Sequence, residues 1–227
     1  MTTCKEHPVI KAVSFDLDGT LIDSTEAIAE SFVHTFDVLG VPQPPREAYV
    51  STIGYTLHQQ FEMLVKDHPA DLCVATYRQH YPQIMREKTF LLPGAKEGLE
   101  RLADAGLRLG FATSKKIQYS LELLDHFGVL DYFESRIGPE EVSHPKPHPE
   151  AVLTSAKELG VSVDELFFVG DTRFDVHAAQ AAKVRCLTVA TGYATKEELI
   201  GLEPERVFDA LPELIDYILE EVQACCK

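Results

Sequence analysis

The feature that most constrains the fold is a series of short apolar runs separated by segments of helical length. The first run, Val9 to Phe15, is rich in β-branched residues and ends at two aspartates, which is typical of a buried strand that enters a loop. Three further runs of this kind are Arg108 to Ala112, Leu166 to Val169 and Val184 to Ala190. The helical segments are Ala95 to Ala105, Lys116 to Phe127, Glu150 to Leu159 and Phe174 to Ala182. This alternation predicts an α/β fold with a parallel sheet covered on both faces.

One long segment interrupts the alternation. Residues 24–88 contain no convincing strand and show helical patterns at Ala27 to Leu39, Leu57 to Val65 and Asp71 to Arg86. The Pro-rich stretch Val41 to Pro45 separates the first two patterns, and Pro93-Gly94 marks the return to the alternating pattern. We therefore predict a catalytic core of residues 1–23 and 89–227, with a small α-helical cap domain of residues 24–88 inserted into it.

Composition limits the partners of this chain. Among its 227 residues, 45% are hydrophobic and 25% charged, as in an ordinary globular protein, and the formal net charge is −15. Without Lys/Arg runs, nucleic acid and membrane surfaces are not expected partners, and an anionic substrate must be held by a local group of cations. No apolar stretch has the length of a membrane span, the first residues lack the apolar middle of a signal peptide, and the five cysteines show no CxxC spacing. We expect a cytoplasmic protein. The sequence gives no indication of its oligomeric state.

Ligands of open parallel sheets bind beyond the carboxyl ends of the strands, so functional residues are expected in the loops after the apolar runs. The first of these loops carries Asp16 and Asp18, at i and i+2 on one side of the chain. Two close like charges are costly unless a cation or proton accompanies them, and Mg²⁺ takes oxygen ligands of this kind. Asp16 is then a candidate nucleophile and Asp18 a candidate proton donor and acceptor. Alternatively, both aspartates cap the helix that follows.

The next two loops carry hydroxyl groups and a cation. Thr113 and Ser114 follow the second run, where hydroxyls at a helix start favour an anion, although both residue types also cap helices that bind nothing. Lys146 stands between prolines just before a helix, and these prolines restrict the backbone around a cation that must be aimed. The alternative for Lys146 is an ordinary solvated lysine. His144 and His148 flank it, but the prolines exclude a helical i,i+4 pair, so the sequence does not favour a metal role for them.

Two further acids, Asp171 and Asp175, follow the run that ends at Val169. Asp171 is a candidate to complete a metal site begun by Asp16, and Asp175 to orient Asp171 or to pair with Lys146. A helix N-cap with a charge in the first turn would have the same pattern. Taken together, the loops bring acids, hydroxyls and a lysine to one edge of one sheet, which helix capping alone does not explain.

In order and content, these loops resemble the four signature motifs of the haloacid dehalogenase superfamily, over Phe15 to about Tyr193. The first motif is matched by FDLDGTLIDS, the second by the Thr113 segment, the lysine motif by KPHPE and the last by GDTRFD. The helical insertion resembles the cap of the phosphoglycolate-phosphatase-like branch, with Ile53-Gly54 and Gly192-Tyr193 as its IG and GY elements. The resemblance implies a Rossmann-like core with a helical cap, and a phosphatase acting on a small phosphorylated metabolite, with phosphoglycolate as the leading substrate.

The resemblance also implies roles for individual residues. Asp16 would attack phosphorus and become a phosphoaspartate, and Asp18 would protonate the leaving oxygen and then deprotonate water. Thr113 and Lys146 would bind the phosphoryl oxygens. The implied ligands of Mg²⁺ are Asp16, the backbone carbonyl of Asp18 and Asp171, with Asp175 behind them.

Further substrate contacts are expected from Ser114, Lys115, Gly54 and Arg46, of which the last two belong to the cap. Weaker candidates in the cap are Tyr55, His58, Gln59 and Tyr77. The second motif departs from the Thr-Asn of the closest phosphatases, because this chain has Thr113-Ser114. The hydroxyl of the first residue is kept, whereas the contact made by the second differs.

Other activities share these motifs. Asp18 argues against a true dehalogenase, and neither Lys66 nor Lys88 has the setting of the imine-forming lysine of a phosphonate hydrolase. A sugar phosphomutase resembling β-phosphoglucomutase, a 5'-nucleotidase and a pyrophosphatase stay open. In a different class, a non-catalytic binding protein of the same fold should have lost a motif acid, but this chain keeps all of them.

Overall fold

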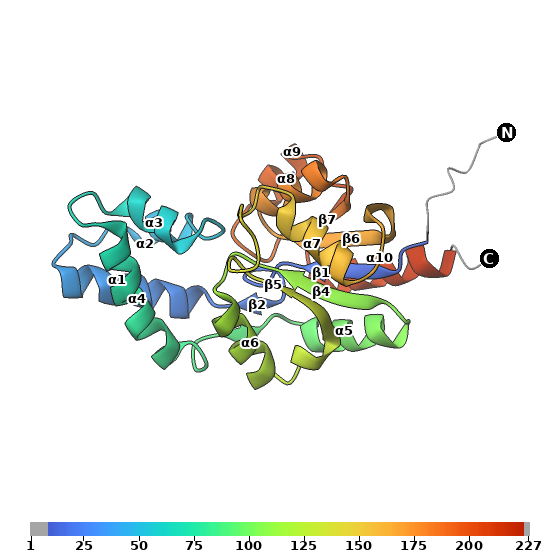
Figure 1. Cartoon of the computed structure of the whole chain (residues 1–227), viewed down its shortest axis with the longest axis horizontal. Coiled ribbons are helices and arrows are strands. Elements are labelled where there is room, and N and C mark those ends of the chain that lie inside the picture. The colour runs from blue at the N-terminus through green and yellow to red at the C-terminus, as the bar shows by residue number, and fades with distance from the viewer. Residues whose placement is uncertain (1–8, 225–227) are drawn as a thin grey trace.

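The core is a parallel sheet, seen in a computed structural model that describes residues 9–224 (Figure 1). Its six strands have the order β5-β4-β1-β6-β7-β8, and every neighbouring pair is parallel. The strands are β1 (Ala12–Phe15), β4 (Arg108–Ala112), β5 (Phe133–Ile137), β6 (Leu166–Gly170), β7 (Arg185–Val189) and β8 (Arg206–Phe208). The α/β fold predicted from the sequence is confirmed.

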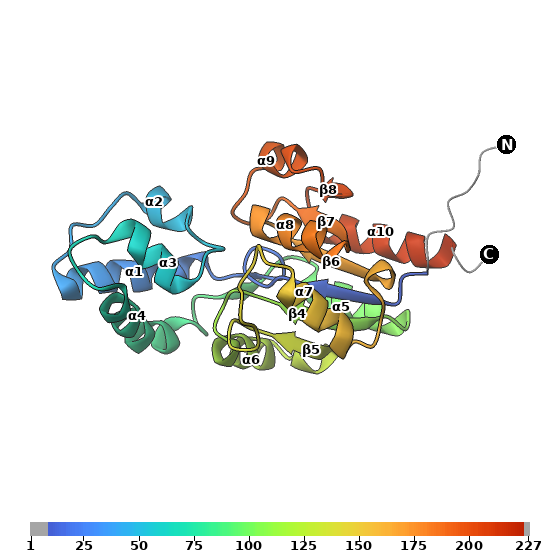
Figure 2. The same cartoon turned by 45° about the horizontal axis from the view of Figure 1, so that its top comes forward.

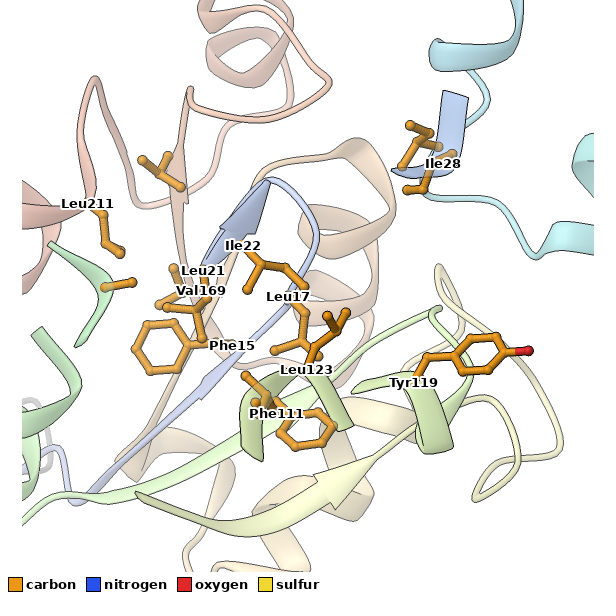
Figure 3. Close-up of a cluster of buried hydrophobic side chains, with 14 of the residues drawn as sticks. Phe15, Leu17, Leu21, Ile22, Ile28, Phe111, Tyr119, Leu123, Val169 and Leu211 are labelled. Carbon is orange, nitrogen blue, oxygen red and sulfur yellow. The ribbon is translucent and has the colours of Figure 1, made fainter. Parts of the chain in front are cut away.

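Helices cover both faces of the sheet, and alternate residues of each strand point to opposite faces. Val13 and Phe15 of β1 belong to the larger hydrophobic cluster, shared with α5 (Ala95–Asp104), α6 (Ile117–His126) and α10 (Leu211–Ala224). Figure 3 shows Phe15, Phe111 and Val169 together in this cluster. Ala12 faces the other way, toward α7 (Glu150–Glu158) and α8 (Arg173–Ala182).

The four predicted strands correspond to β1, β4, β6 and β7, and the four predicted helices of the core to α5, α6, α7 and α8. The edge strands β5 and β8, and the helices α9 (Lys196–Gly201) and α10, were not predicted. In β5, the exposed Glu134 alternates with buried neighbours, and β8 has three residues, so neither forms a continuous apolar run. Among residues 9–224, no helix combines the length and the apolar character needed to cross a membrane.

Four helices form a separate group beside the sheet, at the end to which β1 leads (Figures 1 and 2). They are α1 (Thr25–Leu39), α2 (Arg46–Val50), α3 (Leu57–Leu64) and α4 (Ala70–Ile84). The chain leaves and re-enters the core through a two-stranded antiparallel ribbon, β2 (Ile22–Asp23) and β3 (Phe90–Leu91). We call residues 24–88 the cap, and the division of the chain into core and cap domains stays a prediction.

The cap has an aromatic centre of its own. The ring centroid of Phe32 lies 4.9 Å from that of Phe61 and 5.4 Å from that of Tyr77, and both partners are buried. Aromatic pairs at these separations are stabilising beyond their buried area, by about 1 kcal/mol each. This packing joins α1, α3 and α4 within the cap.

Candidate active site

Three of the four candidate loops start on adjacent strands. Because β4, β1 and β6 are neighbours in the sheet, the residues that follow them, Thr113, Asp16 and Asp171, emerge side by side at its carboxyl edge. Lys146 comes from the loop before α7 and reaches the same place. The structure therefore brings together the acids, the hydroxyl and the lysine singled out in the sequence.

Lys146 lies between two carboxylates. Its Nζ atom is 2.9 Å from Asp16 Oδ1 and 2.6 Å from Asp175 Oδ1, and all three side chains are buried. The second oxygen of Asp175 accepts hydrogen bonds from the backbone N–H (3.0 Å) and the hydroxyl (2.6 Å) of Thr172, at the start of α8. Asp175 therefore both caps its helix and fixes the lysine, so the two interpretations offered by the sequence hold at once.

Asp171 is fully buried and held on both oxygens. Thr20 Oγ1 donates to Oδ1 at 3.1 Å, and the backbone N–H of Tyr193 donates to Oδ2 at 2.9 Å. Gly19 and Gly192 lie against this carboxylate, where an added Cβ would come within 2.4 and 1.7 Å of Oδ2. Glycine at these two positions gives the carboxylate the room that it occupies.

We call Asp16, Asp171 and Asp175 the acidic centre, and burial governs its protonation. It raises the pKa of Asp16 to about 6, against the lowering effect of Lys146, and it raises the pKa of Asp171 well above its usual value. Burial alone would lower the pKa of Lys146, but Asp16 and Asp175 raise it above its usual value, so the lysine is charged. One lysine accompanies three acids, and the centre retains excess negative charge when all three are ionised.

The donor set fits a hard divalent cation. Asp16, Asp171 and Asp175 each place an oxygen within 4.8 Å of the others. Asp16 Oδ1 is buried and faces the charged Lys146 Nζ at 2.9 Å. Carboxylate oxygens are the ligands that Mg²⁺ prefers, and a cation here would offset the cost of burying the three acids together. The residues present therefore suit a magnesium ion.

Asp18 occupies a different setting, at the mouth of the site. Ser24 Oγ donates to its Oδ1, and Lys115 Nζ lies 3.0 Å from its Oδ2. Lys115 is itself buried and donates to the Tyr81 hydroxyl of the cap at 2.8 Å. Burial alone would lower the pKa of Lys115, but Asp18 raises it above its usual value. Asp18 thus contacts a cation and a hydroxyl, apart from the acidic centre.

The second motif is arranged around a turn. The Thr113 hydroxyl is buried and accepts a hydrogen bond from the backbone N–H of Lys115 at 3.1 Å, and Ser114 lines the pocket. The turn precedes α6, whose first backbone N–H groups add partial positive charge to this side of the site. Thr113, Ser114 and Lys115 therefore all face the place where the anion is expected.

A pocket lies between the acidic centre and the cap. Core residues at its walls include Asp16, Asp18, Thr113, Ser114, Lys115 and Lys116. Cap residues at its walls include Gly54, Tyr55, His58, Tyr77, Arg78 and Tyr81. Arg78 and Tyr81 were not singled out in the sequence. Tyr81 could have been found, because it lies at i+4 from Tyr77 and therefore on the same helix face. The pocket thus offers cations beyond those at the acidic centre.

The two cap residues predicted as substrate contacts, Gly54 and Arg46, differ in position. Gly54 lies at the pocket wall with φ +108°, and an added Cβ would come within 2.8 Å of the Phe174 ring of α8. Its close approach is thus to the core helix. Arg46 is 45% exposed, forms an ion pair with Glu26 and is not among the residues that line the pocket.

Comparisons with known proteins agree with this geometry. A family model described as haloacid dehalogenase-like hydrolase matches residues 13–189, most of the chain. The chain belongs to this family, and its similarity to relatives named as phosphatases, given below, makes it a phosphatase of the haloacid dehalogenase superfamily.

The relatives are similar in sequence and in length. The chain is 33% identical over 217 residues to a phosphoglycolate phosphatase of Yersinia pseudotuberculosis, covering 92% of this chain and 93% of that one. It is 30% identical over 230 residues to a phosphoglycolate phosphatase of Salmonella paratyphi A, covering 91% of each. A solved haloacid dehalogenase-like hydrolase from Bacteroides fragilis superposes with a TM-score of 0.83 at 30% identity, covering 90% and 99%. The chain is therefore similar to the phosphoglycolate-phosphatase-like branch over nearly its full length.

Proposed function

We propose that this phosphatase is magnesium-dependent and hydrolyses a small phosphomonoester through a phosphoaspartate at Asp16. The observation that carries the proposal is the position of Asp16, buried between Lys146 and the other two acids and open to the pocket. Phosphoryl transfer needs an in-line nucleophile and cations that offset the charge on the equatorial oxygens. Asp16, Lys146 and the N-terminus of α6 are placed to meet these needs.

In the first half-reaction, a carboxylate oxygen of Asp16 bonds to phosphorus while the bond between phosphorus and the leaving oxygen breaks. Asp18 gives its proton to that oxygen, which leaves as an alcohol. Lys146 and the Thr113 hydroxyl bind the phosphoryl oxygens. Because Asp18 is ion-paired with Lys115 in the free protein, it takes up this proton from water or from the incoming phosphomonoester as the anionic groups of the substrate draw Lys115 toward the pocket.

In the second half-reaction, Asp18 takes a proton from water as the water oxygen bonds to phosphorus. The bond to Asp16 breaks, phosphate is released, and the Asp16 carboxylate is restored. Asp18 ends protonated, as it began. Ser24 donates to its Oδ1 and fixes the orientation of the carboxyl group in both steps.

Asp16, Asp171 and the backbone carbonyl of Asp18 would hold Mg²⁺, with Asp175 behind them. A bound magnesium ion supplies positive charge that offsets the charge of the phosphoryl group and keeps Asp16 ionised. Asp175 fixes Lys146 beside the nucleophile and accepts from Thr172, so its part is to position a cation.

We further propose a substrate with a second anionic group, with phosphoglycolate as the leading candidate. Lys115, Lys116 and Arg78 line the pocket beyond the acidic centre and would hold a carboxylate there. The relatives from Yersinia and Salmonella carry the name phosphoglycolate phosphatase. Both observations favour this class over a neutral sugar phosphate.

The cap of residues 24–88 is proposed to close over the pocket and exclude water, turning on the β2/β3 ribbon. Tyr55 already reaches the core, where Arg173 Nη2 donates to its hydroxyl at 2.5 Å.

The expected cytoplasmic location is retained in this proposal, since Cys73 and Cys186 are buried free thiols of the kind that reducing compartments preserve.

The test is phosphate release from a panel of phosphoglycolate, sugar phosphates, nucleotides and pyrophosphate, with Mg²⁺ and with a chelator. Release that requires Mg²⁺ and favours phosphoglycolate is expected. Preference for a nucleotide or for pyrophosphate would replace the substrate and keep the mechanism. Silence across the panel with folded protein, together with sugar isomerisation activated by a bisphosphate, would replace the hydrolase with a mutase.

A further inference from the structure

A second group of metal-binding side chains lies on the loop that carries Lys146, outside the acidic centre. Within residues 9–224, besides the acidic centre, one group of three places its ligand atoms within 4.8 Å of one another, namely His144, His148 and Glu150. We propose that these three side chains form a binding site for a divalent transition metal ion such as Zn²⁺ or Ni²⁺.

The distances suit a small tetrahedral ion. Glu150 Oε2 lies 2.9 Å from His144 Nδ1 and 3.8 Å from His148 Nδ1. A tetrahedral Zn²⁺ with usual bond lengths holds its ligand atoms about 3.3 Å apart. The two observed separations lie on either side of that value, and the histidine side chains, 65% and 50% exposed, can rotate to adjust.

The carboxylate of this group is fixed before any ion binds. Glu150, the first residue of α7, accepts hydrogen bonds from the backbone N–H groups of Ser143 at 2.8 Å and His144 at 3.0 Å. These bonds, the first above all, lower the pKa of Glu150 and keep it charged. The backbone N–H of Glu150 donates a long hydrogen bond of 3.3 Å to His148 Nδ1, and an ion bound at that atom would replace it. Ordering the carboxylate on binding therefore has a small entropic cost.

Prolines shape the loop without a helix. Pro145, Pro147 and Pro149 fix φ at alternate positions, which excludes a helical i,i+4 pair of His144 and His148, as expected from the sequence. The loop instead brings the two rings to a centroid separation of 4.5 Å. The argument from helical spacing against a metal role therefore does not apply to the conformation that the loop adopts.

The ligand types select the ion. Two imidazoles and one carboxylate suit Zn²⁺, Ni²⁺ and Cu²⁺, whereas Mg²⁺ prefers the all-oxygen set of the acidic centre. The group of His144, His148 and Glu150, called the outer group below, and the acidic centre therefore favour different ions. A neutral imidazole that binds the ion through Nδ1 carries its one proton on Nε2, so binding needs no net loss of a proton from the ring.

A metal ion bound at this site would restrict the loop that positions Lys146. Lys146 stands midway between His144 and His148, and its Nζ contacts Asp16 and Asp175. An ion held by both histidines would close a ring around this residue and restrict the loop. Metal binding at the outer group would then stabilise the position of the lysine beside the nucleophile.

The test is titration of the full chain with Ni²⁺ and with Zn²⁺ while saturating Mg²⁺ occupies the acidic centre. Paramagnetic Ni²⁺ should broaden the ring-proton NMR signals of two of the nine histidines first, the two lost in His144→Ala and His148→Ala. Each alanine variant, and Glu150→Gln, should weaken Ni²⁺ and Zn²⁺ binding by about tenfold or more, since even loss of a residue that only orients a ligand costs that much.

His34→Ala is the matched control. His34 stacks on His80 with ring centroids 4.1 Å apart, yet this pair belongs to neither three-residue group. Its loss should leave the Ni²⁺ affinity unchanged, and thermal unfolding should show each variant to be folded. Asp171→Asn should keep the outer site, which separates this result from any failure of the proposed catalytic metal site. Equal affinity in parent and His148→Ala, or first broadening of other histidines, would overturn the proposal.

Discussion

The acidic centre and the cap wall of the pocket differ in the kind of side chains that they bury. At the centre, Asp16, Asp171 and Asp175 are buried together and partnered by one lysine, so charge is concentrated at a cost to stability. At the cap wall, aromatic rings pack with one another, and the polar groups of His58 and Arg78 border the pocket. A buried charged centre fixes one kind of chemistry, whereas the exposed polar residues of the wall, such as His58 and Arg78, can change without loss of the fold. Substitutions should therefore have very different effects in the two regions.

The sharpest test of the comparison is Asp16→Asn, which keeps the shape of the side chain and removes the nucleophile. Loss of a catalytic nucleophile costs roughly 10⁵-fold or more in kcat. Phosphate release from phosphoglycolate should fall by this order, and no acid-stable phosphoenzyme should form. Asp67→Asn, at an exposed acid of the cap, is the control and should leave kcat unchanged. Substantial turnover by Asp16→Asn would remove the phosphoaspartate from the mechanism.

The same variant should change stability in a direction set by pH. The pKa of Asp16 in the folded protein is about 6, above the unfolded value of 3.8, so its ionisation destabilises the metal-free fold as pH rises through 6. Asparagine does not ionise, so above pH 6 the variant should be more stable than the parent, by up to about 3 kcal/mol. Below about pH 4 the difference should vanish.

Thermal unfolding in chelator across this pH range measures the effect. Added Mg²⁺ should raise the Tm of the parent, because an ion that binds only the folded state stabilises it. The rise should be much smaller in Asp171→Asn, which removes a proposed ligand. A parent that is as stable as Asp16→Asn at pH 8 without Mg²⁺ would show that the centre carries no excess charge.

At the cap wall, Arg78→Ala should act on substrate binding alone. Loss of a charge-assisted hydrogen bond costs about 1.5–3 kcal/mol, so KM for phosphoglycolate should rise roughly tenfold or more while kcat stays close to that of the parent. A phosphomonoester without a second charge should be unaffected. Arg86→Ala removes an arginine just beyond the same helix, paired with Glu122 at 2.9 Å, and serves as the control. A fall in kcat with unchanged KM would place Arg78 in the chemistry instead.

The same contrast explains which parts of the fold and the site could be predicted from the sequence. The strands β1, β4 and β6 are buried and form apolar runs, so the loops at their ends could be recognised from the sequence. Asp16, Thr113, Lys146 and Asp171 could therefore be assigned to one edge. The edge strand β5 could not be found, because its exposed Glu134 interrupts the run.

Contacts between core and cap were harder to predict than the acidic centre. Tyr81 meets Lys115 only because α4 folds back over the loop after β4, and nothing local to either residue requires this. Gly54 lines the pocket, and its Cα packs closely against Phe174 of the core, a contact that the sequence did not indicate. Both contacts depend on how two separately packed regions meet. A local pattern carries no signal for such a contact, whereas an apolar run carries one for a strand.

Arg46 offers the smallest expected effect and the most direct test of a sequence-based prediction at the cap. The sequence favoured it as a substrate contact, and the structure pairs it with Glu26 at 45% exposure. An exposed ion pair contributes about 0–1 kcal/mol, so Arg46→Ala should lower the free energy of unfolding by no more than that. KM and kcat for phosphoglycolate should stay within about twofold of the parent, since twofold corresponds to less than 1 kcal/mol. A tenfold rise in KM, matching that of Arg78→Ala, would mean that closure of the cap carries Arg46 from Glu26 to the substrate.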